Sequence, residues 1–137
     1  MYKVGVTGRF TAIHSLVGDV PPEEKKPHPH DYYLEWCLHV ADLDARGFSL
    51  DISVLEGIRD GMFGHMAERV LNDIEWFEGK TTSLENLCGY VFESLVSSLH
   101  KEMERADVER ISRMEVKIWE NEYAWAGMED VLVSDRS

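Results

Sequence analysis

Residues 2–14 read YKVGVTGRFTAIH, and their pattern is the strongest structural signal in the chain. Apolar side chains and Gly8 occupy the even positions, whereas the odd positions are mainly polar. Alternation over this length is typical of a β-strand with one buried face. The apolar face ends at His14, which shares the parity of the buried side chains.

Residues 28–40 (HPHDYYLEWCLHV) continue the alternation, with His28, His30 and large apolar residues at even positions. The segment between the two stretches, residues 15–27, contains glycine, prolines and a charged run, which predicts a loop. The two strands should form an antiparallel hairpin. That arrangement places the end of the first strand beside the start of the second.

The first helix is expected after the hairpin. Residues 42–47 predict a turn, and residues 48–50 predict a short strand. Asp51 can then cap a helix that ends at Asn72 and Asp73. Its apolar side chains recur at helical spacing: Leu55, Ile58, Met62, Met66 and Val70.

The second helix is expected to begin at a capping box, with Thr82 at the N-cap and Glu85 at the third helical position. It should end in the charged segment of residues 101–109. Its apolar positions are Leu84, Leu87, Cys88, Val91, Leu95 and Leu99.

Two further strands are expected near the end of the chain. Residues 113–118 alternate charged and apolar side chains, and the apolar face ends at Glu120. Residues 123–133 predict the last strand, and residues 134–137 predict a frayed tail. Strands grouped in this way indicate the α+β class. The simplest packing is a four-stranded antiparallel sheet with both helices on one face.

Length and composition predict a single domain over residues 1–137 that can bury a core without covalent staples. The net charge of -12 argues against nucleic acid and anionic membranes as partners, because both attract clustered cations. Cys37 and Cys88 form neither a disulfide framework nor a metal knuckle, which predicts a cytoplasmic location. No apolar run matches a membrane span, and the first fifteen residues lack a signal-peptide core.

Three histidines are candidate metal ligands. The predicted hairpin brings His14 next to His28 and His30, which point the same way because they are two positions apart. Three histidines with an open fourth position are the arrangement of catalytic zinc. The alternative is that they are ordinary polar residues at strand ends. His39 and His100 are expected on the surface.

Glu120 has two interpretations. It can simply mark the exit of the third strand into solvent. Alternatively, it can accept hydrogen bonds from the N–H groups of a ligand.

Six motifs in register resemble the 6-pyruvoyltetrahydropterin synthase / 6-carboxytetrahydropterin synthase family. They are FTAIH (10–14), HPHDY (28–32), GFSLD (47–51), LND (71–73), SLENL (83–87) and VKIWE (116–120). The resemblance implies the tunnelling fold, in which trimers surround a β-barrel, two trimers stack into a hexamer and sites lie between subunits. It also implies zinc on His14, His28 and His30, and a pterin ring anchored by Glu120.

The chain departs from the family pattern at three places. Pro29 replaces the glycine of the family's HGH motif, so the strand there should be an edge or a bulge. Glu24 stands four residues before His28, where many members have cysteine. A branch of the family with glutamate there resembles an aldolase that acts on dihydroneopterin triphosphate. Glu24 is therefore a candidate general base, although residues 23–26 (EEKK) also fit a solvated loop.

The third departure concerns proton transfer. The family's catalytic Asp-His pair falls on Ala67 and Glu68. His65 lies three residues before Glu68, so the two share a helix face and are candidates for a substitute catalytic pair. They equally fit a contact on the protein surface.

The resemblance and the residues together predict a zinc-dependent pterin enzyme. It would be a lyase or aldolase-like enzyme acting on 7,8-dihydroneopterin triphosphate or a related pterin, in a homo-oligomer. Lys25 and Lys26 are the local cations for phosphates. A non-catalytic relative that binds zinc and pterin is one alternative, and an interaction module with incidental histidines is another.

Overall fold

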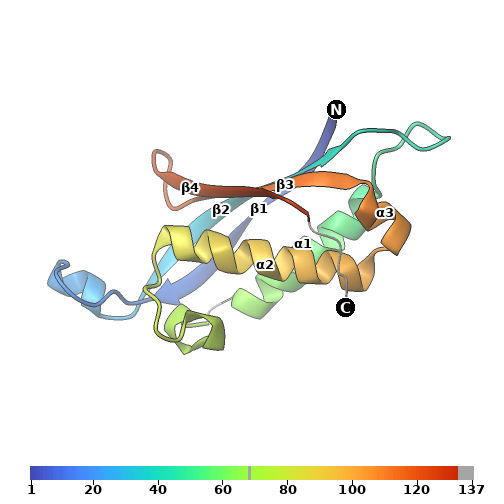
Figure 1. The fold of residues 1–137 in the computed structure, drawn as a ribbon. Coiled ribbons are helices and arrows are strands. Elements are labelled where there is room, and N and C mark those ends of the chain that lie inside the picture. The colour runs from blue at the N-terminus through green and yellow to red at the C-terminus, as the bar shows by residue number, and fades with distance from the viewer. Residues whose placement is uncertain (68, 133–137) are drawn as a thin grey trace.

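A computed structural model describes residues 1–67 and 69–132 (Figure 1). The strands are β1 (Tyr2–His14), β2 (His28–Val40), β3 (Ile111–Trp119) and β4 (Trp125–Val131). The helices are α1 (Ile52–Met66), α2 (Leu84–Glu102) and the short α3 (Arg105–Glu109). Single 3-10 turns are η1 (Pro22–Lys25), η2 (Leu71–Asp73) and η3 (Glu75–Phe77).

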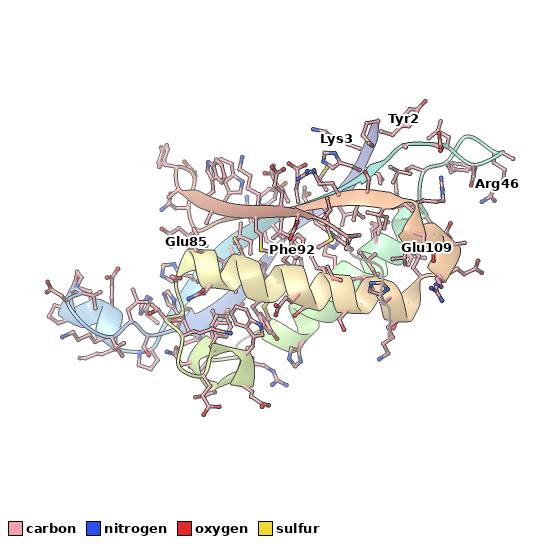
Figure 2. All side chains as sticks on the ribbon, in the orientation of Figure 1. Tyr2, Lys3, Arg46, Glu85, Phe92 and Glu109 are labelled. Carbon is pink, nitrogen blue, oxygen red and sulfur yellow. The ribbon has the colours of Figure 1, made fainter. Side chains whose placement is uncertain are left out.

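The four strands form one antiparallel sheet in the order β1-β2-β3-β4. Helices α1 and α2 cover one face, and the described residues place no helix on the other, which we call the open face (Figure 1). Figure 2 shows the contrast: Phe92 of α2 lies between helix and sheet, whereas Lys3 of β1 lies on the open face. The predicted α+β class and one-sided packing are confirmed.

The β1–β2 hairpin has the predicted register. His14 pairs with His28, Ala12 with His30, and the pairing continues without interruption to Tyr2 and Val40. Even-numbered side chains of β2 from Tyr32 to Val40 are buried in the core beneath the helices. The hairpin therefore fixes the two chain segments that carry the histidines.

Helix α1 begins as predicted but ends earlier. The Asp51 carboxylate caps it by accepting the Ser53 N–H at 2.9 Å. The helix stops at Met66, because Ile13 donates its N–H to the Arg69 carbonyl at 2.9 Å and forms a bridge with Val70. The predicted extension to Asp73 was wrong, since pairing with the end of β1 replaces the last helical turn.

The predicted short strand over residues 48–50 was also wrong. The Asp44 carboxylate accepts the N–H groups of Arg46 and Phe48 at 2.9 and 3.0 Å. These bonds and Gly47, with φ of 88°, hold the segment in a turn. The Phe48 side chain is exposed, so no packing draws the segment into the sheet.

Helix α2 is capped by Ser83 rather than by Thr82, which corrects the predicted capping box. The Ser83 hydroxyl accepts the N–H of Asn86 at 3.1 Å. Thr82 is buried and its hydroxyl donates to the Ser15 carbonyl at 3.1 Å instead. Helix α3, in the charged segment, was not predicted from the sequence.

The last strand begins two residues later than predicted, at Trp125, and ends at Val131. The predicted last residue of this strand and the predicted tail lie at 133–137, outside the described residues. No helix in the described part of the chain has both the length and the apolar content of a membrane span.

Candidate functional site

Three imidazoles converge where β1 ends and β2 begins. The ring centroids of His14, His28 and His30 are separated by 4.5, 4.8 and 5.0 Å. One ring nitrogen of each lies within 4.8 Å of the others. The hairpin register brings the rings together, because His14 faces His28 and His30 is two positions further along the same strand face.

Backbone carbonyls orient two of the rings. His14 Nδ1 lies 3.0 Å from the Thr82 carbonyl, and His28 Nδ1 lies 2.8 Å from the Lys26 carbonyl. A carbonyl can only accept, so each Nδ1 carries the proton and donates it. The Nε2 lone pair of each ring is then free, which is the arrangement of metal-binding histidines.

One of these lone pairs is buried without a hydrogen-bond partner. Among the described residues, none contacts His14 Nε2 within hydrogen-bond distance, although the side chain is buried. An unpaired buried acceptor is costly unless something binds it. The three histidines therefore fit a metal ion with nitrogen ligands, which is what zinc prefers.

The surroundings of His14 favour its neutral form. Burial lowers the pKa of His14, and its neighbours His30 and His28 lower it further, against the opposing effects of the Thr82 carbonyl and Glu120. A neutral imidazole is the metal-binding form. Burial also raises the pKa of the neighbouring Tyr32 phenol, with a further contribution from Glu120.

Hydrogen bonds from distant segments hold the residue that follows His14. The Asn72 side chain accepts the Ser15 N–H at 2.9 Å and donates to the Ser15 carbonyl at 3.0 Å. The Thr82 hydroxyl donates to the same carbonyl. These three bonds fix the backbone position from which His14 projects.

Glu120 stands in the turn between β3 and β4, where its N–H donates to the Ala124 carbonyl at 3.0 Å. It is half-buried and lines a cavity of about 520 Å³ that opens at this end of the sheet. The charge of its carboxylate favours a higher pKa for both His14 and Tyr32. The other residues lining the cavity are Arg9, Asp31, Tyr33, Glu35, Trp119, Asn121 and Glu122.

Glu24 lies in η1, beyond the end of the sheet (Figure 1). Its carbonyl accepts the N–H of Leu16 at 2.7 Å, and its own N–H donates to Pro21 at 2.9 Å. Leu16 is two residues from His14, and Lys26, two residues after Glu24, holds His28. The half-buried Glu24 thus belongs to the loop that frames the histidines.

The structure does not bring His65 to this cluster within one subunit. His65 is exposed and lines a groove between α1 and α2 with Tyr90 and Ser94. Ala67 is exposed at the end of α1. Glu68, the other member of the predicted pair, lies outside the described residues.

Some residues that build the site were not predicted from the sequence. The Thr82 and Lys26 carbonyls orient the rings through the backbone, which leaves no side-chain signature in a sequence. Asn72 did carry a signal, because the LND motif was interpreted both as a helix end and as part of the family resemblance, but no role at the site was predicted for it. Its role depends on a contact across 57 positions.

The sequence model of the 6-pyruvoyl tetrahydropterin synthase family matches residues 3–130. The chain belongs to this family. Its members are pterin-related lyases, so the chain is a member of a pterin enzyme family. No curated protein sequence matches the chain.

Solved structures of 6-pyruvoyltetrahydropterin synthases share the fold. A Plasmodium vivax enzyme, in a variant whose catalytic glutamate is replaced by alanine, has a TM-score of 0.76 at 13% identity, over 96% of this chain and 98% of its own. The Caenorhabditis elegans enzyme has a TM-score of 0.72 at 20% identity, over 94% and 95%. At such identities the likeness establishes the tunnelling fold of the family.

Proposed function

We propose that the chain is a zinc-dependent enzyme of pterin side-chain chemistry. Its substrate would be 7,8-dihydroneopterin triphosphate or a related pterin, and its reaction a lyase or aldolase-like cleavage. One observation carries the proposal: three imidazoles converge and leave the buried Nε2 of His14 unpaired among the described residues.

His14, His28 and His30 would hold the zinc ion. When bound there, zinc supplies a Lewis acid that polarises oxygens of the substrate side chain. The contribution of the chain itself is orientation, because the Thr82 and Lys26 carbonyls fix the imidazole tautomers before any ligand arrives.

Glu120 would anchor the pterin ring. A carboxylate can accept two hydrogen bonds side by side, from a ring N–H and from the neighbouring amino group. The cavity that it lines also contains Tyr33 and Trp119 on the open face of the sheet, and their flat faces suit an aromatic ring.

Glu24 would transfer the proton. In an aldolase-like cleavage it takes the proton of a side-chain hydroxyl, and the carbon that bears this hydroxyl becomes a carbonyl. The adjacent carbon–carbon bond breaks, and its electron pair passes to the carbon attached to the ring, which is then protonated. The catalytic glutamate of the Plasmodium vivax enzyme supports this role.

His65 and Glu68 remain candidates for a second proton-transfer pair. Since His65 faces the α1–α2 groove in one subunit, this role requires a site completed by another copy of the chain. Lys25 and Lys26 are exposed beside Glu24 and would bind substrate phosphates. We therefore propose a homo-oligomer, a trimer or hexamer, as the working form, with a cytoplasmic location.

The test is turnover of dihydroneopterin triphosphate by the zinc-loaded protein. Glu24→Gln should lower turnover by about 100-fold or more while zinc content is unchanged, because loss of a general base typically costs that much. Glu23→Gln is the matched control, since Glu23 is exposed in the same turn. Absence of any pterin product from the zinc-loaded wild type would contradict the enzyme proposal.

Ala67 favours a second candidate, a binding protein. It offers no titratable group at a position where the resemblance implies a catalytic one. This candidate predicts tight pterin binding without product. Binding should be lost in Glu120→Gln and kept in Glu122→Gln, which changes an exposed carboxylate of the same cavity. Turnover that depends on Glu24 would eliminate this candidate.

Metal analysis tests the remaining alternative, an interaction module with incidental histidines. The zinc proposal requires that His28→Ala lower the zinc content by about one ion per chain. If the wild type and His28→Ala hold the same amount of zinc, the histidines are incidental.

A further inference from the structure

A second group of metal-ligating side chains lies on the open face of the sheet. Cys37 and His39 are two positions apart on β2, so both project to that face, and Glu115 reaches them from β3. One sulfur, one ring nitrogen and one carboxylate oxygen from these residues lie within 4.8 Å of one another. The proposed pterin site uses none of the three.

The cluster is held together by its strands. Cys37 is the direct cross-strand partner of Glu115 in the β2–β3 register. His39 Nε2 lies 2.7 Å from Glu115 Oε2, and the His39 side chain is only 14% exposed. These ligands sit on sheet strands rather than on a loop, so their separation is fixed by the backbone ladder.

Gly5 packs tightly against the strand that carries Cys37. It pairs with Cys37 from β1, and a Cβ atom at this position would come within 2.4 Å of the Trp36 carbonyl oxygen and 3.3 Å of the Cys37 Cα. No side chain of β1 therefore occupies the space directly opposite Cys37.

We propose that Cys37, His39 and Glu115 form a second metal site, specific for zinc or a similar thiophilic divalent cation. Thiolate, imidazole and carboxylate are all zinc ligands. With one of each bound, the fourth tetrahedral position of the ion stays open. The ion takes the place of the hydrogen bond between His39 and Glu115. The imidazole binds through Nε2 as the neutral tautomer with its proton on Nδ1, and any second ring proton passes to solvent. The Cys37 thiol releases its proton to solvent.

Charge balance favours such a site. The two charges of the ion are neutralised by the Cys37 thiolate and the Glu115 carboxylate. Glu129 faces Glu115 across the β3–β4 ladder, so a cation also relieves a pair of adjacent carboxylates. Lys3 of β1 is the cross-strand partner of His39, so it lies next to the cluster. Figure 2 shows Lys3 on the open face.

The two sites are independent. The histidine cluster uses even positions of β2 and the second cluster uses odd positions, so they lie on opposite faces of the sheet. His30 and Cys37 are also roughly 23 Å apart along the strand, at about 3.3 Å per residue. Failure of the proposed pterin chemistry would therefore leave this proposal unaffected.

Cobalt substitution tests the site without any activity assay. Metal-free protein titrated with Co²⁺ should develop the near-ultraviolet thiolate-to-cobalt band, which the three histidines cannot produce. The band should disappear in Cys37→Ser and persist in Cys88→Ser. Cys88 is the matched control, because it is buried on α2 and its thiol donates to the Ala126 carbonyl. A wild type without the band, or a band that survives Cys37→Ser, overturns the proposal.

A labelling measurement covers the case in which Cys37→Ser does not fold. Zinc should slow alkylation of Cys37 in the wild type by about tenfold or more, as mass spectrometry of the labelled peptide would show. His39→Ala should remove this protection while the circular dichroism stays native. Equal labelling rates with and without zinc would overturn the proposal in the same way.

Discussion

Asn72 holds the backbone next to His14. Its side chain makes two hydrogen bonds to the backbone of Ser15, at 2.9 and 3.0 Å. Asn72→Ala removes both, so the free energy of unfolding should fall by about 1–3 kcal/mol. Zinc affinity should fall by roughly 10- to 100-fold, as for other groups that orient metal ligands. Chemical unfolding and competition with a chelator measure the two effects.

Asp44→Ala is the control for Asn72→Ala. Asp44 also makes two hydrogen bonds to backbone N–H groups, but in the turn before α1 rather than at the histidines. It should lower stability and leave zinc affinity unchanged. If Asn72→Ala loses stability alone, Asn72 has only a structural role.

At the scale of single residues, the sequence predicted the convergence of the histidines and little of what orients them. His14, His28 and His30 share a parity, and parity decides which face of a sheet a side chain occupies. The Thr82 carbonyl is different, because its contact with His14 depends on how the start of α2 packs against the end of β1. No local pattern encodes that packing.

Helix α2 offers a prediction that separates the observed cap from the capping box expected from the sequence. Ser83→Ala should lower the free energy of unfolding by about 1 kcal/mol, because the Ser83 hydroxyl accepts the Asn86 N–H. Glu85→Ala should cost less than half as much, since Glu85 is exposed and does not reach back to the cap. Equal losses in urea unfolding would favour the capping box.

Helix α1 provides a pH-dependent prediction. Hydrogen bonds from the Ser53 hydroxyl and N–H hold the pKa of Asp51 below its ordinary value. The ionised cap therefore stabilises the fold above the unfolded pKa of about 3.9, and this contribution is lost as pH falls through the lower folded pKa.

Asp51→Ala should accordingly unfold at a lower urea concentration than the wild type at pH 6, and the gap should close toward pH 3. Asp51→Asn is the control, because it keeps a cap acceptor and removes the titration. A gap for Asp51→Ala that is the same at both pH values would contradict the assignment.

At the scale of elements, the errors fall where tertiary contacts override local signals. Val70 fits the apolar line of α1, yet the bridge to Ile13 removes it from the helix. Phe48 alternates like a strand residue, but the Asp44 side chain closes a turn around it. The strands themselves were predictable, because a half-buried sheet imposes its period on the sequence directly.

At the scale of the whole molecule, the sheet has two edge strands, β1 and β4. Edge strands present unpaired backbone groups that invite pairing with another chain. Strand β4 also exposes apolar side chains, with Trp125 and Val131 each 52% exposed and Met128 37% exposed. Pairing β4 of one copy with β1 of the next would satisfy both edges and close a barrel.

This edge pairing predicts the solution mass. Light scattering should give three or six times 15.8 kDa, and Met128→Glu should shift the protein toward monomers by placing a charge at the edge. Phe48→Glu is the control, because Phe48 is 58% exposed in a loop outside the sheet. Each copy carries a charge of -12, so low salt should weaken the assembly as repulsion becomes less screened. A monomeric wild type, or a Met128→Glu variant with unchanged mass, would mean that these edges do not join the subunits.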